Sequence, residues 1–104
     1  MSGEIPEDTN EIVSAAEQGD APAQMSLGLM YKNGKGVPQD YGASAKWLTL
    51  AAEQGNADAQ FHLGGLYAKG QGVPQDNEAT IKWYTLAAEQ GNAIAQLLLG
   101  VMYK

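Results

Sequence analysis

The sequence predicts an all-α protein, a right-handed α-solenoid of stacked antiparallel helix pairs with a period of 36 residues. The period is the first observation, because the string AAEQG recurs at this spacing, beginning at Ala15, Ala51 and Ala87. The second is identity, since residues 15–50 and 51–86 match at 22 of 36 positions. The third is the helical spacing of apolar residues in each copy. Helix pairs of this kind cannot bury their apolar faces alone, so they stack into a superhelix of about six helices.

The first helix of each pair follows a residue type that caps helix N-termini, at Asp20, Asn56 and Asn92. In the first copy, Ala23, Leu27 and Tyr31 recur every four residues, which places them on one helical face. A glycine follows this pattern at Gly34, and its counterpart in the second copy is Gly70. We therefore expect the first helices to end at these glycines.

The second helix opens at Asp40 or Asp76, again a capping residue type, directly after Val-Pro-Gln. It carries a tryptophan and a pair of alanines and ends at Gly55 or Gly91. Glycine at that point can adopt the left-handed conformation of a helix C-cap without strain.

Half repeats are expected at the two ends of the chain. Residues 7–18 resemble a second helix without its first, and residues 93–103 resemble a first helix without its second. The expected organisation is an acidic N-terminal segment, 1–14, that enters the half-repeat helix at about 7–18. A repeat array over 15–104 follows, divided into 15–50, 51–86 and a partial copy, 87–104.

Three glycines lie inside the first helices at equivalent positions, Gly28, Gly64 and Gly100. Each costs about 1 kcal/mol of helix propensity relative to alanine. A cost that recurs at one spacing predicts a close approach between helices, where no side chain has room.

The residues of each copy also resemble a known family. The pattern A-x-x-x-L-G-x-x-Y-x-x-G-x-G-V-x-x-D, followed by W and A-A-x-x-G, is similar to the Sel-one-like repeat, a relative of the tetratricopeptide repeats. In the first copy it falls on Ala23, Leu27, Gly28, Tyr31, Gly34, Gly36, Val37, Asp40, Trp47, Ala51, Ala52 and Gly55. In the second it falls on Ala59, Leu63, Gly64, Tyr67, Gly70, Gly72, Val73, Asp76, Trp83, Ala87, Ala88 and Gly91.

This resemblance implies that the first helices line the concave side of the superhelix and that protein partners bind there. The chain departs from the family where a lysine often precedes the alanine pair, because Leu50 and Leu86 occupy those positions. We expect these leucines either at the edge of the core or exposed, as an apolar ridge on the convex side.

The stretch KNGKGVPQD, Lys32 to Asp40, has the composition of a phosphate-binding loop, with a lysine between two glycines. Such a loop leads into a helix N-terminus, where free N–H groups meet the anion. Here the first glycine ends a helix, and Pro38 separates the loop from the next one. The second copy also replaces Lys35 by Gln71. We therefore interpret the stretch as a joint between helices.

Catalytic chemistry has little support in the sequence. His62 is the only histidine and there is no cysteine, so no histidine-based metal cluster can form. Asp76 and Glu78 belong to a helix start, where negative charge favours the helix dipole. No nucleophile, base and orienting group occur together. We expect a non-catalytic protein without metal or cofactor, and a hydrolase that uses His62 is a remote alternative.

Function is expected where the copies differ on a solvent face, because the shared positions build the scaffold. Most of these positions are spaced by three or four residues and form a stripe opposite the Ala–Leu–Tyr face. The residues expected to bind a partner on the concave side are Ser26, Leu29, Asn33, His62, Gly65, Lys69, Leu98 and Val101. The alternative is that these variable residues contact only water.

Composition excludes several classes of partner. The net charge is −6 and arginine is absent, so no basic stripe could bind a nucleic acid. The apolar stretches are too short to span a membrane, and no secretory signal is visible at the start. The sequence has no cysteine that would indicate a redox compartment. We therefore expect a soluble protein, and both a cytoplasmic and a periplasmic location agree with the sequence.

The sequence therefore predicts an interaction scaffold or adaptor that binds a protein or peptide, of unknown identity, on the concave face. The alternative is a purely structural segment of a larger protein. The half-repeat ends are complementary in type, so head-to-tail self-association is a further expectation.

Overall fold

The computed structural model describes residues 7–103; residues 1–6 of the expected acidic segment, and Lys104, lie outside this range. Within it the chain forms six α-helices and no strand, which confirms the all-α prediction. The half-repeat helices expected at about 7–18 and 93–103 are the first and the last of the six. The bounds are α1 Glu7–Glu17, α2 Ala21–Asn33, α3 Tyr41–Glu53, α4 Ala57–Lys69, α5 Asn77–Glu89 and α6 Ala93–Met102.

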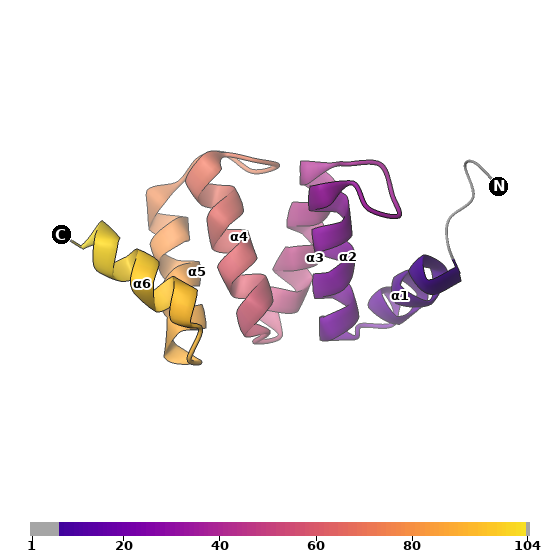
Figure 1. Cartoon of the computed structure of the whole chain (residues 1–104), viewed down its shortest axis with the longest axis horizontal. Helices are drawn as coiled ribbons and strands as arrows, with labels where there is room; N and C mark the ends of the chain where they lie inside the picture. The colour runs from indigo at the N-terminus through magenta and orange to yellow at the C-terminus, as the bar shows by residue number, and fades with distance from the viewer. Residues whose placement is uncertain (1–6, 104) are drawn as a thin grey trace.

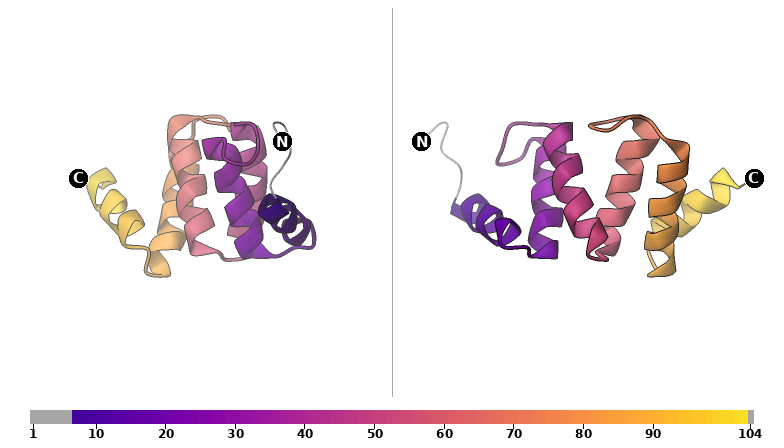
Figure 2. Two further views of the ribbon diagram at one scale, coloured as in Figure 1. Left: turned by 45° about the vertical axis from the view of Figure 1, so that its right-hand side comes forward. Right: turned by 180° about the vertical axis from the view of Figure 1, so that it is seen from behind.

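The helices stack in chain order along an elongated body of 51 × 23 × 18 Å. Helices α2, α4 and α6 lie in front in Figure 1, whereas α3 and α5 lie in front when the molecule is seen from behind in Figure 2. Each helix contacts the next one along the chain. First helices thus form one layer and second helices the other, as expected for stacked pairs.

Five of the helices begin at the capping residues that the sequence predicts. Each cap has extended backbone dihedrals, and its side chain accepts a hydrogen bond from the backbone N–H three residues later at 2.8–3.0 Å. This bond satisfies one of the N–H groups that a helix start leaves without a partner. The caps are Asp20, Asp40, Asn56, Asp76 and Asn92.

Helices α2 and α4 end as predicted, in left-handed glycines. Gly34 has φ 70° and Gly70 has φ 67°, and the Gly34 N–H donates to the Met30 carbonyl at 2.7 Å. The second helices end slightly earlier than predicted. Their caps are glutamines, and the left-handed glycines Gly55 and Gly91, each with φ 95°, follow directly.

The core lies between the two layers. Its largest cluster consists of small and aliphatic residues of α3 and α4 and one tryptophan of α5: Ala45, Leu48, Ala51, Ala52, Ala59, Leu63, Leu66 and Trp83. A lysine ammonium group lies over each tryptophan ring. Lys82 Nζ is 4.5 Å from the Trp83 ring centroid, and Lys46 Nζ is 5.2 Å from the Trp47 ring centroid. Such contacts hold these lysines on the second-helix layer.

Two of the glycines inside the first helices lie where the two helices of a pair approach each other closely, as predicted. A Cβ at Gly64 would lie 2.6 Å from the Tyr84 ring, and a Cβ at Gly28 would lie 2.6 Å from Leu48 Cγ. Nothing lies within 4 Å of a Cβ built at Gly100, because no second helix covers α6 in the described chain. Of the three equivalent glycines, Gly28 and Gly64 therefore allow close packing, whereas Gly100 does not.

We expect Gly64→Ala to lower the free energy of unfolding by about 1–2 kcal/mol, because the clash with Tyr84 outweighs the gain in helix propensity. Gly100→Ala is the matched control, and it should raise the free energy of unfolding by up to about 1 kcal/mol. Urea unfolding followed by circular dichroism measures both. Equal stabilisation by the two substitutions would contradict the close approach at Gly64.

Glutamine side chains link successive helix pairs, a feature that the sequence reasoning missed. The buried Gln60 donates through Nε2 to the Ala52 carbonyl at 3.2 Å, and its Oε1 accepts from Gln90 Nε2 at 2.9 Å. Gln90 Nε2 also donates to the Gly55 carbonyl at 2.8 Å. The preceding pair repeats this arrangement, which we call the glutamine bridge, with Gln24, Ala16, Gln54 and Gly19. The bridge sets how each pair sits on the one before it.

Candidate functional site

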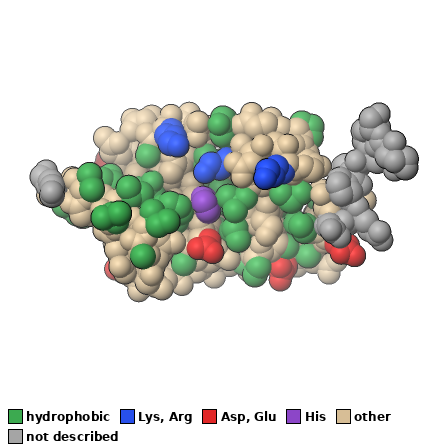
Figure 3. Space-filling model, in the orientation of Figure 1, with side chains coloured by type: hydrophobic (Ala, Val, Ile, Leu, Met, Phe, Trp, Pro, Cys, Tyr) green, Lys and Arg blue, Asp and Glu red, His purple; other side chains and the backbone are tan. Residues whose placement is uncertain are grey.

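The eight residues predicted to bind a partner all lie on first helices. We call the outer surface of α2, α4 and α6 the first-helix face; it is the surface nearest the viewer in Figure 3. The structure places Ser26, Leu29 and Asn33 on α2, His62, Gly65 and Lys69 on α4, and Leu98 and Val101 on α6. Asn33, Lys69 and Val101 are exposed and the other five are half-buried.

On α4 the face is a line of four residues. Asp58, His62, Gly65 and Lys69 follow one another at spacings of four, three and four, so they share one side of the helix. Asp58 lies in the first turn and Lys69 in the last turn of α4. The line is therefore acidic at one end and basic at the other.

His62 lies near the middle of the first-helix face, between basic and acidic side chains, where Figure 3 shows it in purple. Its ring meets that of Phe61 edge-on, with the centroids 5.0 Å apart. Burial lowers the pKa of His62, the charge of Lys32 lowers it further, and the charge of Asp58 opposes both. The imidazole is therefore neutral at pH 7.

Acid should destabilise the chain through His62. The folded-state pKa lies below the usual value of about 6.5, so the unfolded chain binds more protons between these two values and stability falls as the pH drops. Urea unfolding from pH 7.5 to 5 should show a larger loss for the wild type than for His62→Gln. The variant serves to subtract the titration of carboxylates, and identical pH profiles would contradict the assignment.

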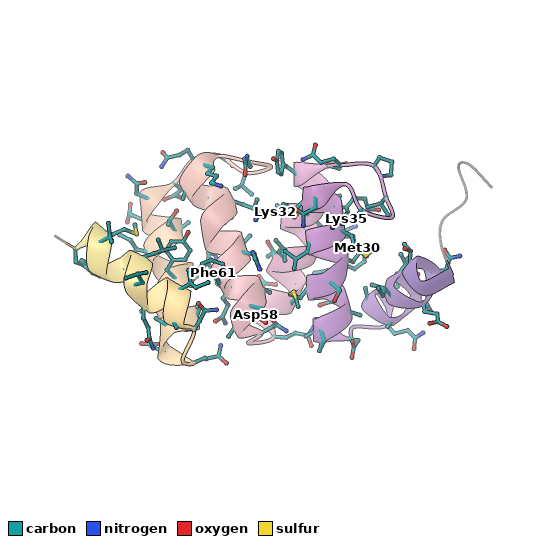
Figure 4. All side chains as sticks on the ribbon, in the orientation of Figure 1. Met30, Lys32, Lys35, Asp58 and Phe61 are labelled. Carbon is teal, nitrogen blue, oxygen red and sulfur yellow. The ribbon has the colours of Figure 1, made fainter. Side chains whose placement is uncertain are left out.

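Lys32 belongs to the same site, although it is not among the eight predicted residues. Its side chain is half-buried on α2, and burial and then the charge of Lys69 on α4 lower its pKa. Figure 4 shows Lys32 near the upper end of α2, with Asp58 near the lower end of α4. The copies do not share a lysine here, since Ala68 occupies the equivalent position. Only the fold brings Lys32 and Lys69 together.

An apolar surface adjoins this charged line on the side of α6. Phe61 stacks on Tyr84 with ring centroids 5.8 Å apart, and Leu98 packs against the same small cluster. Ile94, Leu97 and Val101 are exposed on α6 by 56%, 68% and 62%, and Figure 3 shows hydrophobic side chains gathered there. Of these, Phe61, Ile94 and Leu97 are not among the eight residues that the sequence predicts to bind a partner.

A rival surface lies on the second-helix layer. Helix α3 and the loop after α4 enclose an open hollow of about 430 Å³, lined by Gly42, Ala45, Lys46, Thr49, Leu50, Gly72 and Val73. Leu50 is exposed at its edge, whereas Leu86 is half-buried against the main core cluster. The two leucines that depart from the family pattern thus have different environments, and the second-helix layer has no continuous ridge made by both.

The KNGKGVPQD loop is a joint, as interpreted. Three of its amides are occupied within the protein: Gly34 and Lys35 donate to the Met30 carbonyl, and Asp40 donates to the Tyr31 carbonyl at 2.8 Å. A phosphate bound at this loop would have to compete with these bonds.

The described residues contain neither a metal-binding cluster nor a helix that could span a membrane. In the described part of the chain, no group of three or more His, Asp or Glu side chains is placed to hold a metal ion. Among residues 7–103, no helix has the length and apolar character required to cross a membrane.

Comparisons with known proteins bear on this architecture. The family model described as Sel1 repeat matches residues 21–56 and 57–92. The chain belongs to the Sel1 repeat family. The two matches cut the chain six residues later than the copies defined by AAEQG, at the same period of 36. A comparison with curated proteins found no match.

Solved structures of Sel1 repeat proteins are similar to this chain. The protective antigen c5321 of uropathogenic Escherichia coli is 43% identical, with a TM-score of 0.93, over 96% of this chain and 21% of that one. A Sel1 repeat protein from Oxalobacter formigenes is 44% identical, with a TM-score of 0.86, over 88% and 26%. Cysteine rich protein B of Helicobacter pylori, 24% identical over 86% and 68%, shares the fold with a TM-score of 0.81.

This chain therefore spans about a fifth to a quarter of the first two proteins. Sel1 repeat proteins are generally non-catalytic scaffolds for protein interactions. The resemblance identified in the sequence is thus confirmed at the level of the family and of the helical solenoid.

Proposed function

We propose that this chain is a non-catalytic scaffold that binds a protein or peptide on its first-helix face. The observation that carries the proposal is that charged and exposed apolar side chains lie next to each other on that face. The face joins a line on α4, with Asp58 at one end and Lys69 at the other, to exposed apolar side chains on α6. A protein surface that combines an apolar patch with polar groups around it is typical of interaction sites.

The eight predicted residues support this proposal by their position. They come from three helices that are separate in sequence, and all three helices contribute to one surface of the stack (Figure 1). Repeat proteins commonly use such a continuous surface, because each added pair extends it without changing the core.

Capture of a partner by the immobilised chain, from a lysate of the source organism, tests the proposal when combined with variants. Val101→Glu and Asn33→Glu change exposed residues of the first-helix face, so we expect both to reduce capture while helicity stays unchanged. Leu50→Glu is the control, because it changes the hollow on α3. Loss with Leu50→Glu alone would place the partner on the second-helix layer and overturn the proposal.

We also propose that the 104-residue chain associates head to tail. Helix α6 presents Leu97, whose counterparts Met25 and Phe61 pack against residues of the following helices. Helix α1 of a second copy is of the type that would pack there. Gln18, directly after α1, is equivalent to Gln54 and Gln90, which donate to the first helix of their own pair in each glutamine bridge.

Sedimentation velocity over a dilution series tests this association. The wild type should form a concentration-dependent dimer or larger species, and Leu97→Glu should remain a monomer. Val101→Glu is the control on the same helix and should still associate. A wild type that stays monomeric at the highest concentration would overturn the association.

A further inference from the structure

We infer that the first-helix face binds an extended peptide whose carboxylate side chains lie against Lys32 and Lys69 and whose large apolar side chains lie against Phe61 and Leu98. The inference rests on the proposed function, since it names the chemistry of the partner for that same face. Three features of the face support it: the positions of the lysines, the length of the line from Asp58 to Lys69 on α4, and the neighbouring apolar surface.

Lysines are distributed unequally between the two layers. Of the five described lysines, Lys46 and Lys82 lie over tryptophan rings on the second helices. The other three are Lys32, Lys35 and Lys69, at or just beyond the C-terminal ends of α2 and α4. Figure 3 shows basic side chains in the upper half of the first-helix face and acidic ones in the lower half. The face therefore has a positive end and a negative end.

The helix dipole explains only part of this arrangement. A lysine in the last turn of a helix is favourable near the partial negative charge of the C-terminus, which accounts for one lysine on each of α2 and α4. The dipole does not account for the partial burial of Lys32, nor for its position close enough to Lys69 for the two like charges to interact. Burial and repulsion both disfavour the charged form, and the attraction of a carboxylate placed beside the two amines would offset these costs.

The dimensions of the face fit a short extended segment. From Asp58 to Lys69 the line on α4 covers eleven residues, or roughly 16 Å at 1.5 Å per residue. An extended peptide covers that distance in about five residues. Phe61 lies eight residues before Lys69, so an apolar side chain against it would stand about three or four residues from the carboxylate.

Asp58 gives the site a direction. A second carboxylate at that end would face a like charge, so acidic residues are accepted only at the lysine end. A nucleic acid is a poor fit, because it would bring phosphates to both ends and the chain has no arginine and a net charge of −6.

The test is fluorescence anisotropy with a labelled peptide, Gly-Leu-Leu-Ala-Ala-Asp-Asp-Gly, and the wild-type chain. The control peptide carries Asn-Asn in place of Asp-Asp. We expect the acidic peptide to bind at least about tenfold more tightly at low salt, because the amide side chains of the control peptide cannot form charge-assisted bonds with the lysines. Added salt should reduce the difference.

Two pairs of variants locate the contact. Lys32→Gln with Lys69→Gln should abolish the preference for the acidic peptide, whereas Lys32→Arg with Lys69→Arg should keep it. Lys46→Gln with Lys82→Gln removes the same charge from the other layer and should leave binding unchanged. Leu98→Ser should weaken both peptides equally, because it removes an apolar contact.

Equal binding of the two peptides, or a preference that survives loss of Lys32 and Lys69, would overturn the inference. So would failure of the acidic peptide to bind at all. The capture experiment is independent of these outcomes: a partner lost with Val101→Glu but indifferent to the lysines would leave the proposed function standing without the acidic peptide.

Discussion

Gly72→Ala is expected to lower the free energy of unfolding by about 3 kcal/mol. Gly72 has φ 77°, a left-handed conformation that costs a residue with a Cβ about 1–2 kcal/mol. The added Cβ would also collide with the Tyr41 carbonyl at the start of α3, and backbone cannot move aside as a flexible side chain can. Such overpacking costs roughly 1–3 kcal/mol more. Urea unfolding followed by circular dichroism at 222 nm measures the loss.

Gly55→Ala is the matched control for this prediction. Gly55 has φ 95°, yet nothing lies within 4 Å of a Cβ built there, so only the conformational cost of about 1–2 kcal/mol applies. The difference between the two variants reports the contact of the loop after α4 with α3. Similar losses in both would show that this contact has no energetic role.

Gln60→Ala is expected to lower the free energy of unfolding by about 2–3 kcal/mol. The substitution removes the side-chain donor of the Ala52 carbonyl and one of the two acceptors of Gln90 Nε2. Gln60 is only 4% exposed, so water cannot replace these bonds fully. Each of the two lost bonds contributes about 0.5–1.5 kcal/mol, and the cavity left by the truncated side chain adds to the loss.

Gln96→Ala tests whether the bridge, rather than the glutamine alone, carries this energy. Gln96 is the equivalent residue of α6, is exposed, and donates to the Ala88 carbonyl at 3.0 Å. Its replacement should cost no more than about 1 kcal/mol, because water can take over the bond. Equal losses for Gln60→Ala and Gln96→Ala would contradict a role for the link to Gln90.

Local features of this fold were predictable because their causes are local. A cap such as Asp40 needs only its own side chain and the N–H three residues on, and a left-handed end such as Gly34 needs only a residue without a Cβ. The interpretation of the Gly-Lys-Gly stretch as a joint follows from the same rules. The copies supplied an internal comparison, which separated the joint residues from Lys35.

Contacts between successive helix pairs were harder to predict from the sequence. Gln24, Gln60 and Gln96 are identical in the three copies, which signals a shared role, but spacing does not tell which carbonyl each amide meets. The candidate site shows the same limit. The stripe of varying positions predicted His62 and Lys69, whereas the proximity of Lys32 depends on how α2 and α4 lie beside each other.

By itself the sequence determined the helix pairs, their period and the family, because repeated caps, glycines and apolar spacings act within about four residues. Only the tertiary structure decided whether residues at equivalent positions of the repeats have the same environment. Gly64 lies against Tyr84 while Gly100 is open, and Leu50 is exposed while Leu86 packs on the core. The physical reason is that burial and charge proximity depend on the neighbouring helices, which differ from one pair to the next along the stack.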